Sequence, residues 1–337
     1  MHLHTPSDLS QHDYTIPDPT PQSSLCSSHP DSSSSSSAIT YRIIPGPLIT
    51  HTHLDSCATN FSQHYGVWSM HAAREIGPWA RKGNPVRMSA ARLAQQSLPP
   101  GASNTLVCAL TPQGELVGHC FASCWRHDGE GERRVWWIAQ LLVVRGWRGN
   151  RVGTKMLQTL TQHYDIGIGT SHQQQQQKDV IGVLTTHPYT LCALLRVFAR
   201  GIETLPSRAD YSTNPTGDGH TPLPLEVCGP LMESSPVNYV RDAVPCPGTL
   251  SANTRFYVDH AEPDAALRSV VSGKNKLLRG GWEWPFGELG EGCEYLCVLE
   301  YARDEGGAVR PRILGGGGFF KGIFSRYCAV YFGRCWI

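Results

Sequence analysis

The sequence predicts an α/β protein with a disordered N-terminal tail and a long insertion. Strand-like segments alternate with segments of helical periodicity from about residue 39 to residue 200. One run, residues 134–145 (RVWWIAQLLVVR), is almost entirely apolar, which is typical of a strand buried on both faces inside a sheet. Residues 1–38 and 201–250 are rich in Ser, Pro, Thr or Gly and lack such periodicity.

The elements follow one another in a definite order. Strands are expected at 39–44, 104–111, 116–126, 134–145, 180–186, 255–260 and 294–301. Helices are expected at 53–70, 87–96, 151–163 and 187–199, and over about fifteen residues from Glu262. The Pro-Gln-Gly-Glu turn at 112–115 joins the second and third strands as a hairpin.

The domain organisation follows from composition. The first 40 residues hold twelve Ser, five Pro and no Lys, Arg or Glu, so little apolar surface offsets their ordering entropy. We expect a disordered tail over 1–38, a domain over 39–302 with a loop-like insertion at 201–250, and an atypical Gly-rich tail over 303–337. For that last tail the sequence leaves open a membrane-touching segment, a buried strand and a poorly packed end.

Charge and cysteine content limit the class of function. Lys and Arg (29) nearly balance Asp and Glu (28), so a polybasic nucleic-acid binder is excluded and no nucleic-acid partner is expected. No secretory segment or long apolar run is visible, so we expect no membrane partner and a cytoplasmic protein, with access to the nucleus left open. The twelve cysteines include two C-x3-C pairs on strand-like segments, where buried thiols are favoured over a metal site; we expect no metal.

The residues that point to chemistry lie at the end of the long strand. In GWRGNRVGT (146–154) a buried strand leads through Gly149 and two arginines directly into a helix. The unpaired N–H groups of a helix start, with the helix dipole, form an anion site. Gly149, Gly153 and Thr154 leave room for a phosphate, and Arg148 and Arg151 add positive charge. The alternative is an ordinary strand–helix junction with surface arginines. Neither a Walker A loop nor G-x-G-x-x-G is present.

At these residues the sequence resembles the GNAT superfamily of acetyl-CoA-dependent N-acetyltransferases. The family motif R/Q-x-x-G-x-G/A corresponds here to Arg148–Gly153, with Arg151 in place of the first glycine. The segments WIAQLLV, THPY and NTRFYVDH look closest to fungal members. The resemblance implies a mixed central sheet flanked by helices, splayed at its fourth and fifth strands, with acetyl-CoA as co-substrate in the splay.

The resemblance also implies the cofactor-binding residues. The strand backbone at Leu142, Val143 and Val144 would bond the pantetheine amides. Arg148, Gly149 and the N–H groups of Asn150, Arg151, Val152, Gly153 and Thr154 would form the pyrophosphate site.

The implied reaction is attack of an amine on the thioester, which requires a base, a polarising group and a proton donor. Candidate catalytic residues are Gln140, a polar residue in the apolar strand, with His187 and Tyr189 at a helix start. The family often has a tyrosine in that helix as general acid, and Tyr189 is the only tyrosine of the segment; Phe198 lies nearer the family's position. Further candidates for the base are His127, Asp128, Glu130 and Glu132. The alternative is that these residues belong to a solvated loop. The alternative for Gln140 is a hydrogen bond to a neighbouring strand. The alternative for His187 is a structural role at the start of the helix.

Two functions therefore remain open at the level of sequence. One is an N-acetyltransferase acting on a small-molecule or peptide amine. The other is a GNAT-like domain, weak or inactive in catalysis, that serves as a coenzyme A-binding or protein-interaction module. Arg151, the missing tyrosine and the expected disordered ends favour the second. The sequence does not indicate an oligomeric state.

Overall fold

A computed structural model describes residues 38–127, 133–168, 179–205, 222–278 and 280–302. The predicted tails at 1–38 and 303–337 lie almost wholly outside the described residues, as do Asp128, Glu130 and Glu132. Among the described residues, no helix is both long enough and apolar enough to span a membrane.

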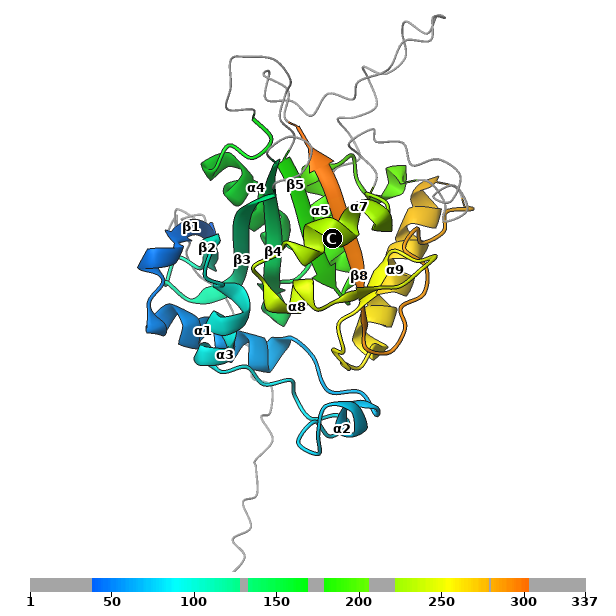
Figure 1. The fold of residues 1–337 in the computed structure, drawn as a ribbon, viewed down its shortest axis with the longest axis horizontal. Coiled ribbons are helices and arrows are strands. Elements are labelled where there is room, and N and C mark those ends of the chain that lie inside the picture. Colours follow the sequence, from blue (N-terminus) through cyan, green and yellow to red (C-terminus); the bar gives the residue numbers. More distant parts are fainter. Residues whose placement is uncertain (1–37, 128–132, 169–178, 206–221, 279, 303–337) are drawn as a thin grey trace, which may run out of the picture. The chain divides into compact units, whose positions relative to one another are not determined.

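The expected α/β fold with a mixed sheet flanked by helices is present (Figure 1). Eight strands form one sheet in the order β1-β2-β3-β4-β5-β8-β7-β6, and within it β4 and β5 form the parallel pair while the other neighbours are antiparallel. The strands are β1 (Thr40–Pro45), β2 (Ser103–Leu110), β3 (Leu116–His127), β4 (Arg133–Val143), β5 (Asp179–Thr185), β6 (Val244–Pro245), β7 (Ser251–Asn253) and β8 (Cys293–Tyr301).

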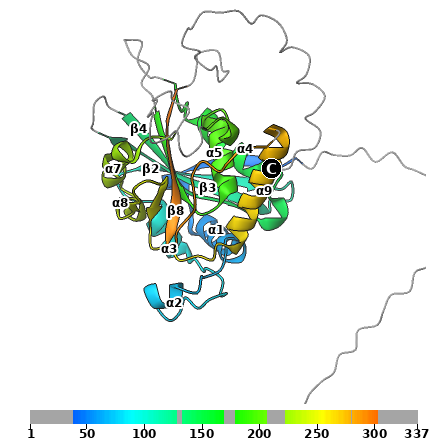
Figure 2. The ribbon, with the colours of Figure 1, turned by 90° about the vertical axis from the view of Figure 1, so that its right-hand side faces the viewer.

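Helices cover both faces of the sheet (Figure 2). The α-helices are α1 (His51–His64), α2 (Ala72–Glu75), α3 (Ala90–Ser97), α4 (Val152–His163), α5 (Pro188–Phe198), α7 (Leu225–Glu233), α8 (Asn238–Arg241) and α9 (Ala261–Leu278). Short 3-10 turns are η1 (Gly46–Leu48), η2 (Arg145–Trp147) and η3 (Ile202–Thr204). One face of the sheet packs against α4 and α5, and the other against α1, α3, α7 and α8.

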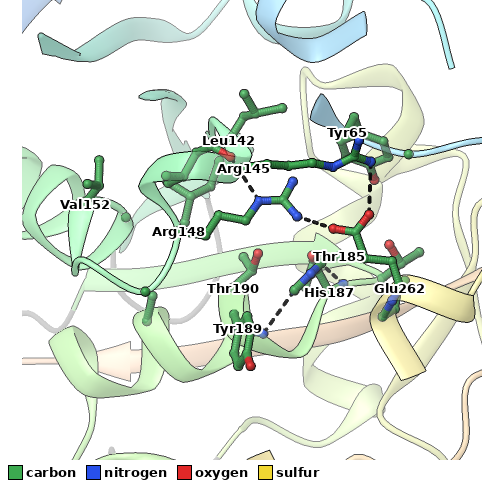
Figure 3. Close-up of a pocket in the computed structure, with 18 of the residues that line it drawn as sticks. Tyr65, Leu142, Arg145, Arg148, Val152, Thr185, His187, Tyr189, Thr190 and Glu262 are labelled. Atoms are coloured by element: carbon green, nitrogen blue, oxygen red, sulfur yellow. Dashed lines mark hydrogen bonds and ion pairs between the residues drawn. The ribbon is translucent and has the colours of Figure 1, made fainter. Parts of the chain in front are cut away.

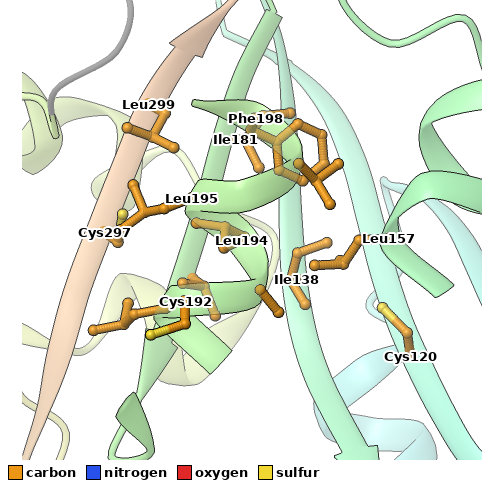
Figure 4. Close-up of a cluster of buried hydrophobic side chains, with 14 of the residues drawn as sticks. Cys120, Ile138, Leu157, Ile181, Cys192, Leu194, Leu195, Phe198, Cys297 and Leu299 are labelled. Carbon is orange, nitrogen blue, oxygen red and sulfur yellow. The ribbon is translucent and has the colours of Figure 1, made fainter. Parts of the chain in front are cut away.

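The largest core lies between the sheet and helices α4 and α5 (Figure 4). Helix α5 is nearly all apolar and buries Leu191, Leu194 and Leu195 against the strands. Phe198, which lies nearer than Tyr189 to the place expected for a tyrosine, is 1% exposed and meets Tyr301 edge to face, with ring centroids 5.2 Å apart. It is therefore part of the core.

Local signals decide where the helices start. Thr50 caps α1 in a capping box with His53, so the helix begins at His51 and not at the predicted residue 53; it ends at His64, before the predicted residue 70. Ser89 caps α3, and His187 caps α5 with Pro188 in its first turn.

Two predictions of local structure were wrong. The described part of the predicted insertion, 201–250, contains α7 and α8, which bury Cys228, Met232 and Val240 against the sheet. Both helices are short, and α7 contains Pro230, so the sequence shows no clear helical period there. Residues 255–260 form no strand; Val258 makes only an isolated bridge with Trp68, and strand β7 lies just before, at Ser251–Asn253.

Candidate active site

The sheet opens between its two parallel strands. Strands β4 and β5 pair from Val135–Val180 to Ile138–Val183, and the pairing ends there although both strands continue. At that point β4 has a bulge: Phe121 of β3 pairs with Gln140 and Ala122 with Ile138, which leaves Ala139 as the extra residue. The bulge turns β4 away from β5, and the gap is the splay that the resemblance implied.

The burial of β4 follows the splay. Residues 135–138 are buried on both faces, as the apolar run predicted, but Ala139, Gln140 and Leu141 are only partly buried. Partly exposed residues in the middle of a sheet have to face a cavity. Two cavities meet here.

The first cavity, which we call the cofactor cleft, has a volume of about 430 Å³. It lies between the carboxyl end of β4, the start of α4, the start of α5 and the first turn of α9 (Figure 3). Eight of the ten residues predicted to bind the cofactor line it: Leu142, Val143, Arg148, Gly149, Arg151, Val152, Gly153 and Thr154. Val144 and Asn150 do not.

The start of α4 faces this cleft. The first intrahelical hydrogen bond is donated by the N–H of Lys155 to the carbonyl of Arg151 (2.9 Å). The amides of Val152, Gly153 and Thr154 therefore have no partner within the helix. A methyl group on Gly153 would meet only Leu141 and Val143, at 3.6 and 3.8 Å, so the glycine is not required by the packing of the protein itself.

Arg151, which replaces the motif's first glycine, caps α4 in the left-handed conformation (φ 60°, ψ 16°). This conformation costs a residue with a Cβ about 1–2 kcal/mol, whereas glycine adopts it freely. The position therefore favours glycine for its backbone angle, and not only for close approach to a ligand. The Arg151 side chain is exposed.

Arginines gather at one end of the cleft (Figure 3). Arg145 donates to Glu262 of α9 (3.1 Å), and Arg148 pairs with the same carboxylate. Arg148 also donates to the carbonyls of Val143 (3.1 Å) and His64 (2.5 Å), and so ties together β4, α1 and α9. The two cations and one carboxylate leave the cluster with a net positive charge.

Only every second residue of β4 directs its backbone N–H and C=O groups into the splay. The N–H of Val144 donates to Val117 of β3 (3.0 Å), so it is not available to a pantetheine amide, contrary to prediction. Because backbone direction alternates along a strand, Leu142 also directs its amide to β3, while Leu141 and Val143 face the gap. Leu142 can meet a ligand in the cleft only with its side chain.

His187 and Tyr189 lie on the α5 side of the cleft. The Nδ1 of His187 accepts the N–H of Tyr189 (3.3 Å), which makes His187 the N-cap of α5, the helix-entry alternative. Desolvation, followed by the charge of Arg148, lowers the pKa of His187 to about 4. At neutral pH it is uncharged.

The second cavity, which we call the aromatic pocket, has a volume of about 250 Å³ and lies on the α1 and α3 side of the splay. Its residues include Phe61, Trp68, Val86, Met88, Leu184 and Phe256. Tyr65, Leu141, Thr185 and Thr190 line both this pocket and the cofactor cleft. The two cavities therefore meet at the splay.

Gln140 lines the aromatic pocket, so the structure separates it from His187 and Tyr189, which line the cleft. Its Oε1 lies 2.7 Å from Nε2 of His119, a fully buried residue of β3. Burial lowers the pKa of His119 to about 4, so the imidazole is neutral and its Nε2–H donates to the Gln140 oxygen. The Gln140 oxygen is therefore bonded to the neighbouring strand, which was the alternative interpretation of this residue. The NH₂ group of Gln140 remains a donor.

Sequence reasoning missed Glu294, the single carboxylate among the described residues that line the aromatic pocket. This residue of β8 is 8% exposed, and burial raises its pKa to about 7, opposed by a hydrogen bond from the Thr254 hydroxyl. Burial, and after it the nearby Glu294 carboxylate, raise the pKa values of Tyr65 and Tyr239, so both hydroxyls stay neutral. The sequence did contain a signal for this residue. Side chains alternate along a strand, so Glu294 shares a face with Leu296 and Val298, both buried in the core.

Of the bases proposed from sequence, His127 is described, and it lines neither cavity; its Nδ1 is 2.9 Å from the hydroxyl of Ser234. No cluster of three or more His, Cys, Asp or Glu that could bind a metal occurs among the described residues.

Comparisons with known proteins point to one family. Residues 66–166 match the model of the acetyltransferase (GNAT) family. The sequence matches no curated protein.

Three solved structures illustrate the similarity. A phosphinothricin acetyltransferase from Sinorhizobium meliloti in complex with acetyl-CoA is 17% identical (47% of this chain, 73% of that chain, TM-score 0.29). A GNAT family N-acetyltransferase from Escherichia coli in complex with CoA is 13% identical (46% and 67%, TM-score 0.27). An aminoglycoside acetyltransferase from an uncultured soil metagenomic sample, in complex with sisomicin, is 15% identical (37% and 70%, TM-score 0.25).

Proposed function

We propose that the protein is an N-acetyltransferase that transfers an acetyl group from acetyl-CoA to a primary amine. The observation that carries the proposal is the meeting of two unlike cavities at the splay of β4 and β5. One has free helix amides and arginines, as a diphosphate requires. The other holds a buried carboxylate, as the deprotonation of an ammonium requires.

In the cofactor cleft, the amides of Val152, Gly153 and Thr154 bind the pyrophosphate of acetyl-CoA. The splay-facing backbone of Leu141 and Val143 bonds the pantetheine arm. The acetyl group then lies at the junction of the two cavities.

In the aromatic pocket, Glu294 accepts a proton from the substrate ammonium, and the neutral amine attacks the carbonyl carbon of the thioester. The NH₂ group of Gln140 donates to the oxygen on which negative charge develops. Collapse of the tetrahedral intermediate breaks the C–S bond, and the thiolate takes a proton from a hydroxyl at the junction. The same oxygen recovers a proton from the nitrogen of the new amide, and the proton taken up by Glu294 is released to solvent. We assign the proton given to the thiolate to Tyr65, which lines both cavities; Tyr189, the residue proposed from sequence, lines only the cofactor cleft.

Two measurements test the proposal. Calorimetry should show acetyl-CoA binding to the full chain, and Gly153→Val should weaken it at least about tenfold, while Gly153→Ala has a smaller effect. Thiol release from acetyl-CoA with a set of amines should require Glu294. Absence of acetyl-CoA binding would refute the proposal, and binding without turnover of any amine would favour the non-catalytic module.

The two tyrosines are distinguished by single substitutions. Tyr65→Phe should lower kcat with little change in the KM for acetyl-CoA. Tyr189→Phe should retain most of the rate, and a larger loss of kcat in Tyr189→Phe than in Tyr65→Phe would return the role to Tyr189.

A further inference from the structure

The walls of the aromatic pocket form a continuous series of rings. Phe61 stacks on Tyr65 (centroids 4.3 Å apart), Tyr65 meets Phe256 (5.6 Å), and Phe256 meets Trp68 edge to face (5.8 Å). Trp68 in turn meets Trp79 (5.4 Å). A pocket of about 250 Å³ with such walls suits the apolar or aromatic body of a small molecule.

The charges of this pocket are unequally distributed. Glu294 is buried, whereas Arg87, Arg92 and Arg255 are exposed on the lining. Arg87 and Arg92 flank the start of α3, and Arg255 follows β7. Within the described part of the chain, none of the three guanidinium groups is in a salt bridge.

This arrangement selects among amines. A buried carboxylate stabilises one ammonium group inside the pocket, since a buried charge requires a partner. Three exposed arginines repel a second positive charge, which disfavours polyamines and basic peptides. The same arginines attract an anionic group. Two of them, Arg87 and Arg92, lie at the start of α3, whereas Glu294 lies on β8.

On the basis of the proposed function, we infer that the acceptor is a small primary amine with an apolar, aromatic-sized body and an acidic group at the end away from the amine. The ammonium lies at Glu294, the body lies along the ring series, and the acid faces Arg87 and Arg92.

Matched probes test this inference by direct binding to the full chain. The probes are 4-(2-aminoethyl)benzoate, 2-phenylethylamine and spermidine, followed by quenching of tryptophan fluorescence, since Trp68 and Trp79 line the pocket. The benzoate should bind about fivefold more tightly than phenylethylamine, because an exposed charge pair contributes up to about 1 kcal/mol, which is about fivefold in Kd. Spermidine should bind most weakly.

Variants assign the preference to the arginines. The double change Arg87→Gln and Arg92→Gln should remove the advantage of the benzoate without weakening the binding of phenylethylamine. Arg268→Gln, an exposed arginine of α9 outside both cavities, should change neither.

Equal binding of benzoate and phenylethylamine, or tighter binding of spermidine, would overturn the inference. Because this readout needs no turnover, the result is independent of the thiol-release test. Turnover of phenylethylamine and benzoate at equal kcat/KM would leave the acetyltransferase proposal in place and remove only the acidic group from the substrate class.

Discussion

Gly182 of β5 lies directly beside Trp137 of β4, and a Cβ on Gly182 would come within 2.2 Å of the Trp137 ring. It is the second-to-last pair between the two strands; the last is Ile138 with Val183, after which the strands separate. The fully buried indole therefore fills the space beside a residue without a side chain, immediately below the splay. The close contact holds β4 and β5 together at the point from which both cavities open.

Gly182→Ala should consequently lower the stability of the protein. The methyl group has to displace a large, enclosed ring, and overpacking of this kind costs about 1–3 kcal/mol. Calorimetric melting should show a lower Tm. Gly146→Ala is the matched control, because a Cβ at Gly146 meets nothing within 4 Å and its φ is not positive. Equal Tm values for the two variants would contradict the assignment.

Arg151→Gly should stabilise the protein by about 0.5–1 kcal/mol, because glycine relieves the left-handed angle but also loosens the unfolded chain. Arg151→Ala retains the unfavourable angle and should give no such gain. Both variants lose one positive charge at the cleft, so both should bind acetyl-CoA somewhat more weakly at low salt and about as well at high salt. Denaturant unfolding and calorimetry at two salt concentrations separate backbone strain from charge. Much tighter binding by Arg151→Gly at every salt concentration would show that the arginine obstructs the ligand.

Glu262→Gln should strengthen acetyl-CoA binding by a few fold at low ionic strength. The Glu262 carboxylate pairs with Arg145 and Arg148 in the cofactor cleft. Without its negative charge, both guanidinium groups can interact with the diphosphate of acetyl-CoA. The gain should shrink as salt is added. Glu233→Gln on α7, exposed and on the other face of the sheet, should leave the affinity unchanged. A weaker affinity of Glu262→Gln would mean that Glu262 mainly positions Arg148.

Glu294 should couple stability to pH. Its pKa is about 7 in the folded protein against an ordinary value of 4.5, so between these values the folded state retains a proton that the unfolded state releases. Stability should thus fall as pH rises from about 4.5 to 7. Glu294→Gln should remove this dependence and stabilise the protein at pH 8 by on the order of 3 kcal/mol. Glu226→Gln, an exposed glutamate of α7, should do neither.

The same carboxylate should limit the rate. Proton acceptance from the amine requires the ionised form, so kcat/KM should rise through about pH 7 and then level off until the thioester becomes labile. Glu294→Gln should lose most of the rate while its affinity for acetyl-CoA stays within about twofold. A fully active Glu294→Gln enzyme would exclude Glu294 as the base.

The sequence by itself determined six of the eight strands of the sheet, most helices and the turn that leads into α4, because each depends on local order. The apolar run at 134–145, Gly149 and the small residues at 153 and 154 predict a strand, a turn and an open helix start without any distant partner. The positive φ of Arg151 and the helices α7 and α8 were not apparent, since the first is a backbone angle and the others are stabilised mainly by the sheet.

The tertiary structure decided which residues meet. Glu294 is more than 150 residues from Gln140 along the chain, yet both line the aromatic pocket because β8 lies beside β5 and β4 bulges at Ala139. Burial then raises the pKa of Glu294, and burial depends on every element packed around it. Local sequence specifies the direction of a strand, whereas the gap between two strands and the charge state of a group inside it are properties of the assembled sheet.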